Sequence, residues 1–178
     1  MKKKFLIHIL DTNIFLTGID VNLLEGIIYT TSAIIEEVKD YRYIEKNRNI
    51  INKIHAAIEG KKLKIKHPDM KYIIKVSEIS KKTGDFRALS SVDKELVALG
   101  LELIKESNES VRLYSNDYSI ENVCSELNIP FSPLYKVGIE SKITWQIYCP
   151  HCQTVYKSED LNSVCEICGS KLKRRPKE

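Results

Sequence analysis

The chain has 178 residues, enough for one domain of ordinary size and a small second one. Hydrophobic residues make up 43% of it, and no apolar run approaches the ~18 residues that a membrane-spanning helix needs. We therefore expect no membrane-spanning helix and no membrane partner. The short apolar run after Met1 has no small-residue cleavage site, so we expect a cytoplasmic protein.

The net charge of +4 is unevenly distributed. Residues 38–82 carry 13 Lys or Arg against five Asp or Glu, whereas the rest of the chain has 15 basic and 19 acidic residues. A second basic cluster lies in the last eight residues. Such blocks are either solvated faces or surfaces that bind a phosphate backbone, and charge alone does not choose between them.

Periodicity predicts alternating strands and helices along the first 130 residues. Strands are expected at residues 5–9, 26–30, 61–66 and 111–115, and helices at 33–40, 41–60, 69–82, 91–106 and 119–127. The alternation of Lys with Leu and Ile at 61–66 is typical of a half-exposed edge strand. The whole pattern indicates an α/β fold with a parallel sheet flanked by helices.

Asp11 directly follows the first predicted strand. In parallel α/β sheets, ligands and substrates gather at the carboxyl ends of the strands, so this carboxylate lies where an enzyme would use one. An acid in this position is also a common helix N-cap. Asp117 repeats the arrangement after the strand at 111–115, which places a second acid at the same edge of the sheet.

Two further acids, Glu37 and Asp93, lie on predicted helices. Asp93 stands three residues after Ser90, the spacing of a capping box, and Glu37 would otherwise be a solvated residue. Clustered carboxylates suit a hard divalent cation, which can activate water for phosphodiester hydrolysis. Taken from the residues alone, the prediction is an α/β domain with a candidate metal site.

Two Cys-x-x-Cys pairs follow near the end of the chain. They supply Cys149, Cys152, Cys165 and Cys168, with twelve residues between the pairs. Four thiolates complete the tetrahedral shell of a structural Zn²⁺, and a segment this short has no adequate core without the metal. The fifth cysteine, Cys124, lies on an apolar helix face and is expected to be an inert core residue.

The motifs around the four acids resemble those of PIN domains, a family of metal-dependent ribonucleases. The resemblance rests on residues 9–13, 31–38, 89–93 and 114–119. Residues 82–85, together with the four-cysteine segment, further resemble one PIN subgroup, the archaeal and eukaryotic endonucleases that mature the 3′ end of small-subunit ribosomal RNA. The chain has no long insertions and looks like an archaeal form.

The resemblance implies a catalytic site for Mg²⁺ or Mn²⁺. Its ligands would be Asp11, Glu37, Asp93 and Asp117, supported by Thr12, Asn13, Ser90, Ser115 and Asn116. The family pattern places the second acid directly before an aliphatic residue, which favours Glu37 over Glu36. Asp85 is assigned to the turn at 82–85.

The resemblance also implies a domain division and an RNA partner. We expect a PIN-like nuclease domain at 1–130, a linker at 131–146 that is a connection or an edge extension of the sheet, a zinc ribbon at 147–172 and a basic tail at 173–178. The basic block would flank a cleft for single-stranded RNA, with the ribbon and tail on neighbouring helical RNA. Tyr41, Tyr43, Tyr118 and Trp145 are candidates for stacking on bases, although packing in the core or on the surface is the first expectation for each.

The expected function is cleavage of precursor small-subunit rRNA within an assembling ribosomal particle, alongside its assembly proteins. Two alternatives stay open. One is a VapC-type PIN toxin, against which the four cysteines argue. The other is a non-catalytic assembly factor that binds rRNA through its basic surface and ribbon.

Overall fold

The computed structural model describes residues 5–40, 44–134, 138–139 and 141–177. Its strands are β1 (Leu6–Leu10), β2 (Ile27–Thr30), β3 (Leu63–Ile65), β4 (Ser110–Tyr114), β5 (Phe131–Ser132), β6 (Trp145–Tyr148), β7 (Val155–Tyr156) and β8 (Lys173–Pro176). Its helices are α1 (Thr12–Phe15), α2 (Ser32–Val38), α3 (Ile44–Glu59), α4 (Met70–Thr83), α5 (Ser91–Glu106) and α6 (Tyr118–Glu126), with short 3-10 helices η1 (Val21–Leu23) and η2 (Ser158–Asp160).

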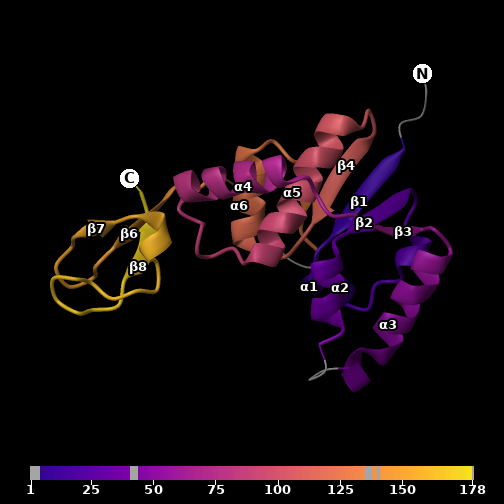
Figure 1. Ribbon diagram of the computed structural model, residues 1–178, viewed down its shortest axis with the longest axis horizontal. Helices are drawn as coiled ribbons and strands as arrows, with labels where there is room; N and C mark the ends of the chain where they lie inside the picture. The colour runs from indigo at the N-terminus through magenta and orange to yellow at the C-terminus, as the bar shows by residue number, and fades with distance from the viewer. Residues whose placement is uncertain (1–4, 41–43, 135–137, 140, 178) are drawn as a thin grey trace.

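The first five strands form one parallel sheet in the order β3-β2-β1-β4-β5. Helices α4, α5 and α6 lie to one side of this sheet and α1, α2 and α3 to the other (Figure 1). The predicted α/β class with a flanked parallel sheet is therefore confirmed. The lysine-rich strand β3 lies at the edge, as its alternating pattern predicted, because an edge strand can keep charged side chains in water.

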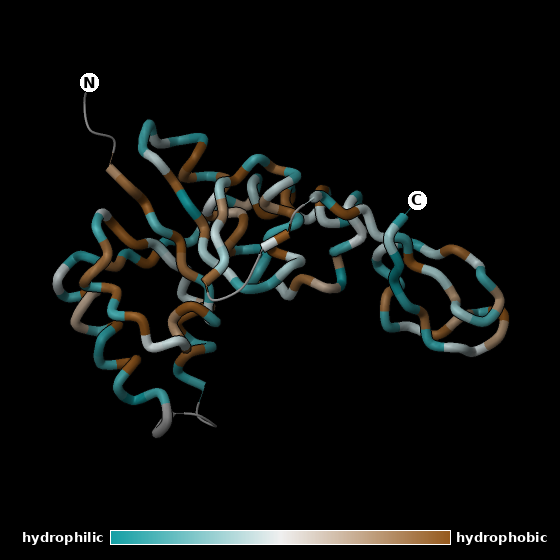
Figure 2. The backbone as a smooth tube through the Cα atoms, turned by 180° about the vertical axis from the view of Figure 1, so that it is seen from behind, coloured by the Kyte–Doolittle hydropathy of each residue, from teal (hydrophilic) through white to brown (hydrophobic). Residues whose placement is uncertain are grey.

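Helix α5 forms the centre of the domain core. Every residue from Leu96 to Leu103 is buried, and Gly100 faces Ile9 of β1, whose Cδ1 would lie in ordinary van der Waals contact, 3.4 Å, with a Cβ at this position. The predicted capping box starts this helix: Ser90 accepts from the Asp93 amide, and Asp93 accepts from the Ser90 amide. In Figure 2, brown, apolar stretches run through the strands and recur along the helices.

A second, three-stranded antiparallel sheet holds the cysteine pairs, in the order β7-β6-β8. It lies at one end of the elongated molecule, beyond α4 and α6 (Figure 1). Its buried core contains only Ile147, Cys149, Cys165 and Leu172. So small a core is typical of a unit that folds around a metal.

The structure corrects the expected ends of this second unit. Lys173–Pro176 is not a free tail but strand β8, which pairs with β6, so the basic residues are carried on a sheet. The stretch expected as linker begins in β5, which pairs with β4 and extends the sheet edge, the second of the two alternatives, and it ends in β6, which belongs to the other sheet. Backbone hydrogen bonds to existing strands, rather than composition, decide both cases.

None of the helices in the described part of the chain is both long enough and apolar enough to span a membrane. Tyr41 and Tyr43, two of the four candidate stacking residues, lie outside the described residues.

Candidate active site

The carboxyl ends of β1 and β4 bring Asp11 and Asp117 to one edge of the sheet. The two strands pair in parallel with Leu10 opposite Tyr114, and the Asp11 amide donates to the Tyr114 carbonyl at 3.1 Å. Each acid then caps the helix that follows: Asp11 caps α1, and Asp117 caps α6. Asp11 and Asp117 are therefore both helix caps and strand-end carboxylates, so the two interpretations of these acids do not exclude each other.

Three donors hold the Asp11 carboxylate, which is only 4% exposed. The Thr12 amide donates to Oδ1 at 2.7 Å, while the Asn13 side chain at 2.5 Å and the Ser115 hydroxyl at 2.7 Å donate to Oδ2. Asn13 also accepts from the Asn116 amide at 3.1 Å, which ties the loop after β1 to the loop after β4. Three of the five predicted supporting residues thus contact Asp11, and a fourth, Asn116, contacts Asn13.

Burial raises the pKa of Asp11 to about 6, although the hydrogen bonds from Ser115 and Thr12 oppose this. The negative charges of Asp93 and Asp117 raise the same pKa further. These three acids therefore interact electrostatically. A buried carboxylate beside two others is stabilised in its charged form by a bound cation, and oxygen donors are those that Mg²⁺ and Mn²⁺ prefer.

Glu37 and Glu36 point in different directions. Glu37 accepts a 2.5 Å hydrogen bond from the hydroxyl of Thr12, the neighbour of Asp11, whereas Glu36 forms an ion pair with Lys39 at 3.8 Å and is largely exposed. The helical twist separates the two side chains. Glu37 is thus the one that contacts the loop carrying Asp11.

The four acids form a looser group than the cysteines. Within the described residues, only Cys149, Cys152, Cys165 and Cys168 bring three or more ligand atoms within 4.8 Å of one another. Asp93 uses Oδ2 in its capping box and Asp117 uses Oδ1 for the Ser119 amide, so each has a second carboxylate oxygen for another contact. A hard cation that keeps several waters can be held by such a spaced set.

The four cysteine sulfurs suit a tetrahedral Zn²⁺. Their Sγ atoms are 3.3 Å apart for Cys149 and Cys168 and 3.5 Å apart for Cys152 and Cys165. Four Zn–S bonds of about 2.3 Å at tetrahedral angles would place the sulfurs about 3.8 Å apart. Cys124 lies elsewhere, fully buried in α6, and burial raises the pKa of its thiol, which suits an inert core residue.

Comparison with known proteins identifies the family. Residues 8–103, more than half of the chain, match the family described as the PIN domain of ribonuclease. The Methanocaldococcus jannaschii protein "Endoribonuclease Nob1" is 34% identical over 169 residues, covering 95% of this chain and 77% of that protein. The chain belongs to the PIN-domain Nob1 family.

Two other relatives of this Nob1-family chain bear on the choice between functions. A Thermoplasma acidophilum protein, "Ribonuclease VapC1", is 32% identical over 95% of this chain and 78% of its own length. The Saccharomyces cerevisiae "20S-pre-rRNA D-site endonuclease NOB1" is 38% identical over 86 residues, 48% of this chain and 17% of its own. Since the VapC1 alignment runs through the cysteine pairs, it does not favour a toxin that consists of the PIN domain alone.

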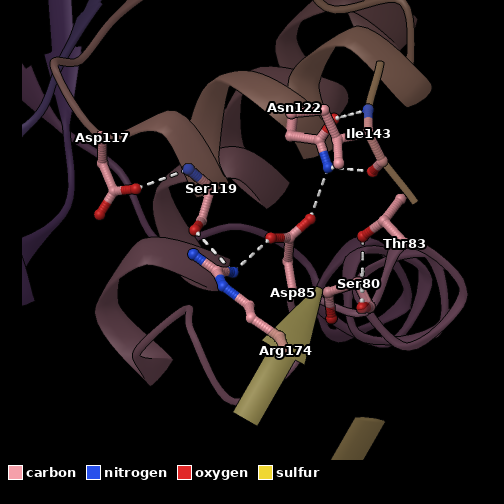
Figure 3. Close-up of polar contacts among 8 residues, drawn as sticks. All are labelled: Ser80, Thr83, Asp85, Asp117, Ser119, Asn122, Ile143 and Arg174. Atoms are coloured by element: carbon pink, nitrogen blue, oxygen red, sulfur yellow. Dashed lines mark hydrogen bonds and ion pairs between the residues drawn. The ribbon is translucent and has the colours of Figure 1, made fainter. Parts of the chain in front are cut away.

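A junction that the sequence did not predict connects the two sheets of this Nob1-family chain (Figure 3). Asp85 does form the expected turn, with its amide donating to the Ser80 carbonyl, but its side chain is completely buried. Its carboxylate accepts from Arg174 of β8 at 3.0 Å and from Asn122 of α6 at 2.7 Å. Burial raises the pKa of Asp85, while Asn122 and Arg174 oppose that rise.

Further contacts reinforce the junction. Asn122 also bonds both the amide and the carbonyl of Ile143, at 2.8 and 2.7 Å. Glu159 of η2 pairs with Lys81 at 2.8 Å, and its carbonyl accepts from Arg87. A buried carboxylate is rarely unpaired, but the burial of Asp85 is visible only in the structure, and its partner is 89 residues away in sequence. The sequence therefore offered no local signal for this ion pair.

Part of the predicted basic block is engaged within the domain. Lys62 donates to the carbonyls of Leu24 and Gly26, Lys53 donates to the Gly18 carbonyl, and Lys66 pairs with buried Glu102. These lysines stabilise loops and a buried acid. A phosphate-binding surface would have to use the remaining basic residues.

Proposed function

We propose that this chain is a divalent-metal-dependent endoribonuclease that cleaves precursor small-subunit rRNA at its 3′ end. It would act in the cytoplasm, on the pre-ribosomal particle and among that particle's assembly proteins. The observation that carries the proposal is the position of Asp11 in a chain of the Nob1 family. Its carboxylate is buried at the ends of β1 and β4, and burial and the charges of Asp93 and Asp117 raise its pKa. The yeast relative's name supplies the substrate class.

The chain's own residues would prepare the site for hydrolysis. Thr12, Asn13 and Ser115 orient the Asp11 carboxylate, and Asn13 keeps the loops after β1 and β4 together. Asp117 is fixed by the Ser119 amide at 2.6 Å. Together with Asp93 and Glu37, these acids would hold Mg²⁺ or Mn²⁺. When bound, such a cation activates water and stabilises the charge that develops on the phosphate.

The test is cleavage of a precursor-end RNA by Asp11→Asn. The amide keeps the shape of the side chain but loses its charge, so we expect cleavage to fall by at least about 100-fold while RNA binding stays within about twofold. The assay compares reactions with added Mg²⁺ or Mn²⁺ and without either, using protein dialysed under conditions that retain zinc.

The matched control is Asp20→Asn. Asp20 caps η1 through the Asn22 amide, so this exchange has the same chemistry at a capping acid outside the proposed metal ligands. Wild-type cleavage by Asp11→Asn would reject the assignment. Tight RNA binding without metal-dependent cleavage by the wild-type protein would instead support the non-catalytic assembly factor.

A further inference from the structure

A cavity of about 450 Å³ lies where α6 meets the cysteine-bearing sheet. Its lining comes from both units and from the segment between them: Tyr118, Ser119, Asn122, Ile139, Ser141, Ile143, Trp145 and Arg174. The volume is within the range of about 300–1,000 Å³ that is usual for small-ligand sites. The cavity therefore has room for a planar organic group.

The chemistry of the lining suits a flat aromatic ligand. The Arg174 guanidinium lies 4.5 Å from the centre of the Trp145 ring, and Tyr118 is 54% exposed. Nucleobases stack on aromatic rings and on guanidinium planes in this kind of setting. None of the described lining residues carries a carboxylate, and the charge of Arg174 is offset by Asp85. Among the described residues, the lining therefore suits an uncharged flat ring better than a cation or a free phosphate.

The cavity also adjoins the proposed catalytic acids. Tyr118 directly follows Asp117, and the amide of Ser119 donates to Asp117 Oδ1 at 2.6 Å. In Figure 3, Ser119 lies between Asp117 and Arg174, and Arg174 Nη1 is 3.5 Å from the Ser119 hydroxyl. A nucleotide with its base in the cavity would therefore have its phosphate near the acidic edge of the sheet.

Contacts within the protein order the side chains that line the cavity, in the absence of a ligand. Asp85 fixes Arg174, and Asn122 fixes Ile143 through both of its amide groups. Ordering such side chains on binding costs affinity, and here the contacts of the junction have already ordered them. The cavity also depends on the docked position of β6 and β8, which supply Trp145 and Arg174.

We propose that this cavity binds one nucleobase of single-stranded RNA beside the cleaved bond. The identity of the ligand, RNA, rests on the proposed function. The position and shape of the site rest on the cavity alone. Tyr118 and Trp145 would then belong to one recognition site, in which the base stacks on the ring of Tyr118.

The test uses Trp145, the only tryptophan of the chain, as a fluorescent reporter. The probe is a six-nucleotide single-stranded oligoribonucleotide, titrated without added Mg²⁺ or Mn²⁺ so that it stays intact. We expect a saturable change in Trp145 emission. Replacing one nucleotide at a time by an abasic one should identify a single position whose loss removes most of the change.

Tyr118→Ala should weaken binding of the intact oligonucleotide by about 5- to 150-fold, the effect of losing one stacked base. Tyr118→Phe keeps the ring and should bind like the wild type. The abasic oligonucleotide should bind the wild type and Tyr118→Ala equally, because it has no base to stack. Circular dichroism checks that both variants keep the overall helix content of the wild type.

Unchanged affinity of Tyr118→Ala, or an emission change that no abasic position affects, would overturn the proposal. Neither readout requires catalysis. If metal-dependent cleavage were absent while these effects were present, the proposed function would fail, and the cavity would stand as a base-binding site with no cleaved bond beside it. If Tyr118→Ala bound and cleaved like the wild type, the base site alone would fail.

Discussion

Asp11 shows how one residue can combine a structural and a chemical task. Its three hydrogen-bond donors hold the carboxylate in place, yet burial raises its pKa to about 6. The folded, metal-free protein therefore binds a proton at Asp11 more tightly than the unfolded chain does. The stabilisation from this proton is complete below the ordinary pKa of 3.8 and is lost as the pH rises through about 6.

At the residue scale we therefore predict a difference in pH dependence between the wild type and Asp11→Asn. From pH 5 to pH 7, without divalent cations, the free energy of unfolding of the wild type should fall by about 1 kcal/mol relative to the variant. Urea unfolding at a series of pH values measures this. Both proteins share every other titrating group, so parallel pH profiles would contradict the shifted pKa.

At the element scale, the cysteine-bearing sheet cannot rely on its apolar core. Two of its four buried residues, Cys149 and Cys165, are themselves proposed metal ligands, which leaves Ile147 and Leu172. Structural Zn²⁺ contributes about 10–16 kcal/mol of binding free energy in zinc-finger peptides, far more than two buried aliphatic side chains. The metal is therefore expected to decide whether β6, β7 and β8 form.

We predict that Cys165→Ser, or removal of zinc, abolishes the hydrogen-exchange protection of residues 145–176. The five-stranded sheet at residues 6–132 should keep its protection, because its core is separate. Cys124→Ala is the matched control: it removes a buried thiol from α6 and should retain zinc. Persistent protection of β6 and β8 in zinc-free protein would show that the sheet folds without metal.

At the scale of the whole molecule, one buried acid orients the two units. Asp85 lies in the turn after α4, and its ion pair with Arg174 joins that turn to β8. Gly84 makes the close approach possible: its φ is +80°, and a Cβ there would lie 2.4 Å from the Trp145 carbonyl oxygen. Removing one partner of a buried pair leaves the other desolvated and unpaired, which is costly.

We predict that Arg174→Ala loosens the docking of the cysteine-bearing sheet without unfolding either unit. We expect the docked arrangement of the two units to lose about 1–3 kcal/mol of stability. This is less than the cost of breaking a fully buried ion pair, because the Arg174 side chain is 30% exposed. Small-angle scattering should show a more extended molecule, and hydrogen exchange should rise in α6.

Arg175→Ala is the control for that experiment, because Arg175 contacts Gln146, Gln153 and Tyr148 within its own sheet. Asp85→Ala combined with Arg174→Ala should cost less than the sum of the single changes, since no charge is then stranded. If Arg174→Ala and Arg175→Ala gave the same scattering and the same hydrogen exchange in α6, the Asp85–Arg174 ion pair would have no role in docking.

The sequence by itself determined the local structure of this protein. The capping box of Ser90 and Asp93, the edge character of β3 and the spacing of the cysteine pairs depend on side chains a few residues apart or on a strand's own pattern. The strand-end position of Asp11 and Asp117 follows from the parallel sheet, which the alternating elements indicate. These features were predictable because short-range physics produces them.

Only the tertiary structure decided the long-range contacts. The hydrogen bond between Thr12 and Glu37 is visible only in the structure, and the pairing of β8 with β6 shows that the expected basic tail is a strand. The Asp85–Arg174 pair and the cavity beside Asp117 exist because two separately patterned units dock. No local pattern specifies a partner 89 residues away, since that contact depends on how complete surfaces fit together.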